Sequence, residues 1–205
     1  MLNLLWILLG GYAVGMLLPL CLQRRQAQSL ASSICAIVAT STGIALGLLG
    51  LTASEPVTGS ISSTIPLLTC AIRLDGLASF FLLTISLAGL AAAIYAIGYV
   101  RHFEGRASVG ALGSLFNAFL GSMTLVVLAD NGFFFLTVWE LMSLGSYFLV
   151  VTEHEKAEVR HAGFFYLVMM HVGTAFILLT FLLLFQQGTS FSFDAFRHPE
   201  QPLSE

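Results

Sequence analysis

The sequence predicts an all-α membrane protein, a polytopic bundle of about six membrane-spanning helices with the N-terminus outside. Of the 205 residues, 57% are hydrophobic and only 9% are charged, and the mean hydropathy is +0.91. Because a soluble domain carries about 25% charged residues, this composition indicates a membrane protein. The hydrophobic residues form continuous runs of about the 20 residues that a helix needs to cross a bilayer. Continuous rather than alternating runs favour helices over a β-barrel.

The first apolar run is not a cleavable signal peptide, because no charge precedes it and Arg24 and Arg25 follow it. Two Gly-x-x-x-Gly motifs, at residues 11–15 and 43–47, put pairs of glycines on one helix face. We expect them to pack within the bundle, with a dimerisation face as the alternative. The predicted spans are residues 4–22, 30–51, 77–100, 110–129, 132–151 and 163–185.

Basic residues predict the topology. Six of the eight Lys and Arg residues lie in three connections, at residues 23–29, 101–109 and 152–162. The positive-inside rule places these connections in the cytoplasm and the N-terminus outside. We therefore expect a transmembrane domain at residues 1–185. Residues 186–205 form either a polar extracytoplasmic tail or the start of a continuation.

The outer connections carry polar and turn-forming residues. The first, at residues 52–76, is rich in Ser, Thr and Pro, and we expect a short surface element near residues 66–68. At its end, Arg73 and Asp75 predict a local ion pair, with Asp75 as the N-cap of the third span. Asp130 and Asn131 predict a tight turn between the fourth and fifth spans.

Glu140 is the one Asp, Glu, Lys or Arg residue that falls inside a predicted span. An ionisable group in the membrane costs several kcal/mol unless it is paired, hydrated or protonated, so it marks a candidate proton or ion path. Thr137, Ser143 and Tyr147 share its helix face and form a polar stripe that could support the carboxylate. The alternative is a protonated glutamate that is held for packing alone.

His171 in the next span is the second candidate for proton translocation. At about 1.5 Å per residue, Glu140 lies about 16 Å and His171 about 12 Å from the inner ends of their helices. Antiparallel neighbours would therefore place the two residues at similar depth. Histidine titrates near neutral pH and can pass a proton between its nitrogens. The alternative is a neutral histidine bonded to a backbone carbonyl or a hydroxyl.

Other kinds of chemistry find no support in the sequence. No basic patch suggests nucleic acid, and Cys21, Cys35 and Cys70 have no metal-ligand spacing. There is no Gly-rich phosphate loop, nucleophile motif or cofactor ligand set. We therefore expect no catalytic residue, no metal ligand and no cofactor in this chain.

Four motifs stand out in their order and spacing. They are Arg73-Leu-Asp-Gly-Leu-Ala-Ser-Phe-Phe81, Tyr95-Ala-Ile-Gly-Tyr99, Trp139-Glu-Leu-Met-Ser-Leu-Gly-Ser-Tyr-Phe-Leu-Val150 and Phe191-Ser-Phe-Asp-Ala-Phe-Arg197. Together they resemble the antiporter-like membrane subunits of the complex I and membrane-bound hydrogenase superfamily. The likeness is greatest to component B of hydrogenase-4, of the formate hydrogenlyase type, and the most specific motif is the glutamate followed by Leu-Met-Ser.

The resemblance implies a subunit that couples electron transfer to proton translocation without being catalytic itself. Nickel–iron and iron–sulfur centres would lie on partner subunits, which are other membrane subunits and peripheral hydrogenase or dehydrogenase subunits. The location would be a bacterial or archaeal inner membrane. In that family the glutamate matching Glu140 pairs with a lysine on a later helix. That helix is absent from these residues, so we expect an N-terminal portion that does not pump alone. The alternatives are a cation/proton antiporter subunit and a structural membrane anchor.

Overall fold

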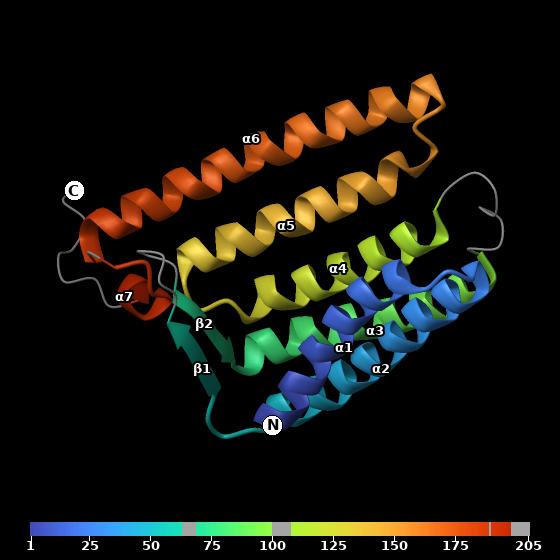
Figure 1. The fold of residues 1–205 in the computed structure, drawn as a ribbon. Coiled ribbons are helices and arrows are strands. Elements are labelled where there is room, and N and C mark those ends of the chain that lie inside the picture. The colour runs from blue at the N-terminus through green and yellow to red at the C-terminus, as the bar shows by residue number, and fades with distance from the viewer. Residues whose placement is uncertain (63–68, 100–107, 189, 198–205) are drawn as a thin grey trace.

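A computed structural model describes residues 1–62, 69–99, 108–188 and 190–197 of the chain. Within these residues, six helices are long and apolar enough to cross a membrane, which confirms the predicted helical fold of about six spans. They lie side by side, with α5 and α6 to one side of the other four (Figure 1). They are α1 (Leu2–Cys21), α2 (Arg25–Leu51), α3 (Gly76–Tyr99), α4 (Val109–Leu128), α5 (Gly132–Val150) and α6 (Ala157–Gly188).

Two helices are longer than their predicted spans. α2 begins at Arg25 rather than at residue 30, and α6 begins at Ala157 rather than at residue 163. A hydropathy window ends where polar residues begin, but Arg, Gln, Glu and Ala are good helix formers, so the helices continue beyond the apolar run. The connection between α5 and α6 therefore shortens to a single 3-10 turn, η2 (Val151–Glu153), and a few residues. Most of the predicted basic connection at residues 101–109 lies outside the described residues.

The connection after α2 contains a β-hairpin that the sequence analysis did not predict. Strands β1 (Val57–Ser62) and β2 (Thr69–Leu74) pair antiparallel. Their Ser, Thr and Gly content is typical of a loop, whereas their Val and Ile residues favour a strand. The short element expected near residues 66–68 lies outside the described residues. The hairpin, the N-terminus and α7 (Phe193–Arg197) lie at the same end of the bundle (Figure 1).

Helices α1 to α4 form the core of the protein. α2 packs against α1 and α3, and α1 packs against α4. Glycines allow these close approaches, because a methyl group at Gly15 would collide with Asn117 Oδ1 and one at Gly43 would collide with Ser86 Oγ. Both Gly-x-x-x-Gly motifs therefore make contacts within the bundle. The largest fully buried side chains are Leu8, Leu46, Leu82 and Leu128.

The turn between α4 and α5 joins the hairpin to the segment after α6. The backbone N–H of Asp130 donates to the Ala71 carbonyl at 2.8 Å, and the N–H of Phe193 donates to the Asp130 carbonyl at 3.3 Å. Asn131 caps α5, since its Oδ1 accepts hydrogen bonds from two backbone N–H groups of the first turn. This network confirms the predicted turn and fixes the ends of α5 and α6 that the predicted topology places outside, which we call the outer ends; the opposite ends are the inner ends.

Candidate functional site

Glu140 and His171 face each other across the contact between α5 and α6. Glu140 Oε2 lies 3.6 Å from His171 Nε2, and the two side chains are 33% and 52% exposed. The structure therefore brings together the two residues that the sequence singled out, on neighbouring helices joined by a short connection. Their role in proton transfer remains a prediction.

The hydrogen bonding of the His171 ring determines which nitrogen can exchange a proton with Glu140. Nδ1 lies 2.9 Å from the Leu167 carbonyl oxygen, one turn earlier on α6. Because a carbonyl oxygen only accepts hydrogen bonds, Nδ1 must carry a proton to make this bond. Nε2, which faces Glu140, is then the nitrogen that gains and loses a proton.

This geometry lets the pair hold one proton in two ways. The proton can lie on the Glu140 carboxyl beside a neutral imidazole, or on His171 Nε2 beside a carboxylate. The net charge of the pair is zero in both arrangements, so transfer between them avoids the cost of an isolated charge in the membrane. A separation of 3.6 Å is longer than a hydrogen bond, so a small side-chain rotation must precede direct transfer.

Two further polar contacts lie on either side of this pair. Trp139 Nε1 donates to Thr174 Oγ1 at 3.2 Å towards the outer end. Ser146 Oγ and the Tyr166 hydroxyl lie 2.6 Å apart towards the inner end. The sequence analysis did not predict these contacts, because they depend on the register between α5 and α6. Aligning the helices on Glu140 and His171 would have found both.

The predicted polar stripe is less closely tied to the carboxylate. Thr137 Oγ1 donates to the Phe133 carbonyl at 2.9 Å, and Ser143 Oγ donates to the Trp139 carbonyl at 2.9 Å. Thr137 is exposed and Ser143 is buried. The Tyr147 ring packs against the neighbouring Phe148. The structure thus places these hydroxyls on their own helix, and their support of Glu140 remains a prediction.

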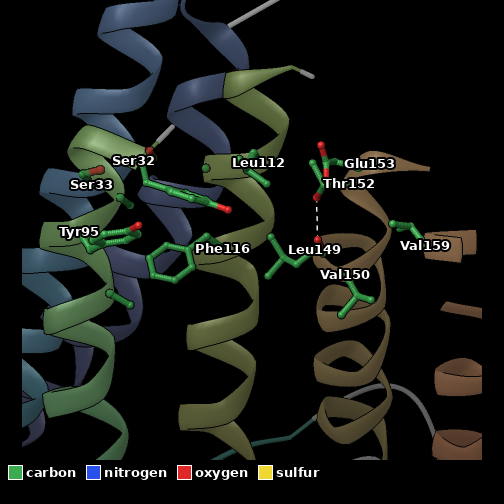
Figure 2. Close-up of a pocket in the computed structure, with 14 residues that line it drawn as sticks. Ser32, Ser33, Tyr95, Leu112, Phe116, Leu149, Val150, Thr152, Glu153 and Val159 are labelled. Atoms are coloured by element: carbon green, nitrogen blue, oxygen red, sulfur yellow. Dashed lines mark hydrogen bonds between the residues drawn. The ribbon is translucent and has the colours of Figure 1, made fainter. Parts of the chain in front are cut away.

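A cavity of about 390 Å³ lies at the inner end of the bundle, away from the Glu140–His171 pair. Figure 2 shows Ser32, Tyr95 and Phe116 on one side of it and Leu149 and Thr152 on the other. Its lining residues come from α2, α3, α4, η2 and the inner ends of α5 and α6, and most of them are apolar. Neither Glu140 nor His171 lines it, so its size alone does not identify the functional site.

A charged cluster lies at the outer end of the bundle beside a second cavity, of about 370 Å³. Arg73 Nε lies 3.7 Å and Arg197 Nη2 lies 4.0 Å from Asp75 Oδ2. The first contact confirms the predicted ion pair, and Asp75 also caps α3 as predicted, since its Oδ1 accepts from the Ala78 N–H. Burial raises the pKa of Asp130 in this cluster, and the nearby Arg73 and Arg197 oppose that rise.

Metal-binding side chains are not gathered in the part of the chain that the structure describes. Within residues 1–62, 69–99, 108–188 and 190–197, no group of three or more His, Cys, Asp and Glu residues could hold a metal ion. The Glu140–His171 pair remains the candidate functional site, and proton exchange remains the chemistry that we predict for it.

Comparison with known proteins gives the relationship of the chain. Residues 129–200 match the family described as NADH:quinone oxidoreductase/Mrp antiporter, transmembrane region. The chain is 36% identical over 126 residues to hydrogenase-4 component B of Escherichia coli, which covers 62% of the chain and 18% of that protein. It is 31% identical over 120 residues to NADH-quinone oxidoreductase subunit L of Buchnera aphidicola, covering 58% and 19%.

The fold also matches a solved structure. A chain of the membrane-bound sulfane sulfur reductase, an archaeal respiratory membrane complex, superimposes with a TM-score of 0.75 at 15% identity, covering 94% of this chain and 38% of that one. The chain spans about a fifth of the length of the two curated relatives. Residues 129–200, which include Glu140 and His171, thus carry the matched transmembrane region. Over part of its length the chain is similar to antiporter-like membrane subunits of the complex I and membrane-bound hydrogenase superfamily.

Proposed function

We propose that the chain forms part of a membrane subunit that couples electron transfer to proton translocation. The complex would be of the hydrogenase-4/formate hydrogenlyase type or the NADH-quinone oxidoreductase type. The observation that carries this proposal is the 3.6 Å approach of His171 Nε2 to Glu140 Oε2. The names of the related proteins support the choice of complex.

In this function, the pair loads one proton and releases it when its surroundings change. Glu140 is the proton-carrying group, and His171 accepts the proton through Nε2 while Leu167 holds its other nitrogen. A change in nearby charge during electron transfer attracts or repels the proton of the pair and so drives loading or release. The chain itself catalyses no redox reaction in this proposal.

The proposal also implies partners and a location. We assign the nickel–iron and iron–sulfur centres of such complexes to their peripheral hydrogenase or dehydrogenase subunits. Other membrane subunits of the complex would lie against the exposed side of α6, where large apolar side chains such as Phe164, Met169 and Phe176 face outward. The location would be the inner membrane of a bacterium or archaeon.

The test is a Glu140→Gln substitution in the full-length protein within its native complex. Inverted membrane vesicles are supplied with hydrogen, formate or NADH, and proton uptake is followed with a pH-sensitive dye alongside electron transfer. We expect proton uptake per electron to fall about tenfold or more, because Gln carries no exchangeable proton of this kind.

Glu55→Gln is the matched control, since Glu55 is exposed in the outer connection. It removes the same charge outside the membrane, so proton uptake should stay at the wild-type level. Unchanged uptake in the Glu140→Gln complex would overturn the proposal.

The second candidate is a cation/proton antiporter subunit, which the family description favours through its mention of the Mrp antiporter. Such a subunit exchanges ions without an electron donor. Ion-driven proton movement in vesicles without hydrogen, formate or NADH would therefore support it. A purely structural anchor predicts a different result. Glu140→Gln would then harm neither assembly nor turnover, whereas substitution of the inner Arg24 and Arg25 would harm assembly.

A further inference from the structure

The contact between α5 and α6 differs on the two sides of the Glu140–His171 pair. On the inner side it carries hydroxyl groups, of which Ser146 Oγ and the Tyr166 hydroxyl lie 2.6 Å apart across the helices. On the outer side, beyond the Trp139–Thr174 bond, packed aromatic rings fill the space between α5, α6 and α7. These rings are Phe135, Phe181, Phe185, Phe191, Phe193 and Phe196.

This difference decides where protons can move within the contact between α5 and α6. Phenylalanine offers no group that can donate or accept a proton, and the ring centroids of Phe135 and Phe181 lie only 5.6 Å apart. The outer cavity reaches Phe135 and Trp139 from the side of α3 and α4, and neither Glu140 nor His171 lines it. Within the helix contact, hydroxyl groups, which can both donate and accept a proton, lie on the inner side. The inner side is therefore the one along which protons can move by hydrogen-bonded steps between these helices.

The hydrogen bonds at Ser146 have a defined direction. Ser146 Oγ donates to the Ser143 carbonyl at 2.8 Å, so in the short contact with Tyr166 the phenol is the donor. Ser146 lies six residues from Glu140, which is about 9 Å along the helix axis. The path therefore requires water molecules to bridge this distance along the partly buried contact between the two helices.

We propose that Tyr166 and Ser146 pass protons between the inner surface and the Glu140–His171 pair. This inference rests on the function proposed above. An incoming proton binds the phenol oxygen of Tyr166 as the phenol proton moves to Ser146 Oγ. The hydroxyl proton of Ser146 then passes to water on the Glu140 side. Each hydroxyl ends with one proton, one proton has crossed, and rotation of both hydroxyls restores the first arrangement.

Exposed side chains that can bind and release protons lie at the inner end of α6. Glu158 and His161 are exposed there, and His161 packs edge-on against the Phe165 ring. Tyr166 lies about one and a half turns beyond His161 along α6. The phenol is thus the first hydroxyl that a proton meets on α6 between this surface and His171.

The test uses Tyr166→Phe and Ser146→Ala in the full-length protein within its native complex. Proton uptake by inverted vesicles, driven by hydrogen, formate or NADH, is measured in H₂O and in D₂O. We expect uptake to fall about tenfold in both variants, because each loses one hydroxyl of the path. The ratio of the rates in H₂O and D₂O should rise, because proton delivery then limits the rate.

Two variants serve as matched controls. Ser146→Thr keeps the hydroxyl, and Tyr95→Phe removes a phenol oxygen from an exposed tyrosine on α3. Both should take up protons at close to the wild-type rate.

Three outcomes would overturn the inference. The first is unchanged uptake in Tyr166→Phe and Ser146→Ala. The second is slower uptake with an unchanged isotope ratio, which indicates a purely structural tie between the helices. The third is a loss in Ser146→Thr as large as in Ser146→Ala. Glu140→Gln separates the two proposals, because normal uptake in that variant overturns the proposed function as well.

Discussion

The α1–α4 bundle and the α5–α6 pair use polar groups in opposite ways. In the bundle, polar oxygens fill the spaces left by glycines, as Ser86 does at Gly43 and Asn117 does at Gly15. In the α5–α6 pair, polar side chains meet one another, as Glu140 and His171 do. The first arrangement fixes helices at close range. The second leaves groups that can exchange a proton.

Packing follows the same division. Buried residues are common in α4, whereas no residue in the apolar window of α6 is buried. A methyl group at Gly173 of α6 would meet nothing within 4 Å, in contrast to Gly15 and Gly43. The bundle is thus a rigid support, and α6 is an outlying helix that the α5 contacts and the outer network hold in place.

The largest expected effect comes from a methyl group in the tight bundle. The added methyl group of Gly15→Ala would collide with Asn117 and Cys35, so both must move away from α1. Overpacking of this kind lowers the free energy of unfolding by about 1–3 kcal/mol. We expect a clear fall in the thermal unfolding midpoint of the purified full-length protein in detergent. Gly10→Ala, on the same helix with nothing within 4 Å, is the control and should unfold like the wild type. Equal stability of the two variants would contradict the rigid-bundle description.

Much of the fold can be predicted from hydropathy and charge, because each span is a local apolar run. The hairpin could not, since the apolar residues of Val57 to Ser62 alternate too weakly to predict a strand and its Ser, Thr and Gly residues are typical of a loop. The start of α6 at Ala157 was also missed, because a helix does not end where its apolar run ends.

The candidate site also has one part that can be predicted from the sequence and one part that cannot. Glu140 stands out in the sequence because a charged residue in an apolar run is costly, and depth along the helix brings His171 into consideration. The contact of Ser146 with Tyr166 depends on how α5 and α6 are aligned, which no local pattern records. Serine and tyrosine are also uncharged, so neither residue stands out in an apolar run as a glutamate does.

A smaller effect is expected from a polar contact of the α5–α6 pair. Trp139→Phe removes the hydrogen bond to Thr174, and such bonds between membrane helices contribute about 0.6 kcal/mol on average. The unfolding midpoint should therefore shift less than in Gly15→Ala. Trp6→Phe, at an exposed position on α1, is the matched control. A loss as large as that of Gly15→Ala would show that the α5–α6 contact is part of the rigid support.

The smallest effect is expected at the outer charged cluster and depends on pH. Burial raises the pKa of Asp130 above its ordinary 3.8, with Asp194 and Asp75 adding to the rise and Arg73 and Arg197 opposing it. The folded protein then binds this proton more tightly than the unfolded chain, so stability falls as the pH rises from 3.8 through the raised pKa.

Asp130→Asn should therefore raise the unfolding midpoint slightly at neutral pH and leave it unchanged below the ordinary pKa. Unfolding midpoints measured across this pH range check the prediction. Glu55→Gln, outside the cluster, should show no such pH-dependent difference. A lower midpoint for Asp130→Asn at neutral pH would show that the arginines outweigh burial.

The pairing of His171 with Glu140 is the central claim, and proton uptake per electron in a His171→Gln complex tests it most directly. His154→Gln, at an exposed position in the inner connection, is the matched control, and Glu140→Gln gives the level expected for loss of the pair. We predict that His171→Gln assembles normally but falls close to the Glu140→Gln level, while His154→Gln behaves like the wild type. A wild-type ratio of protons to electrons in His171→Gln would contradict the account.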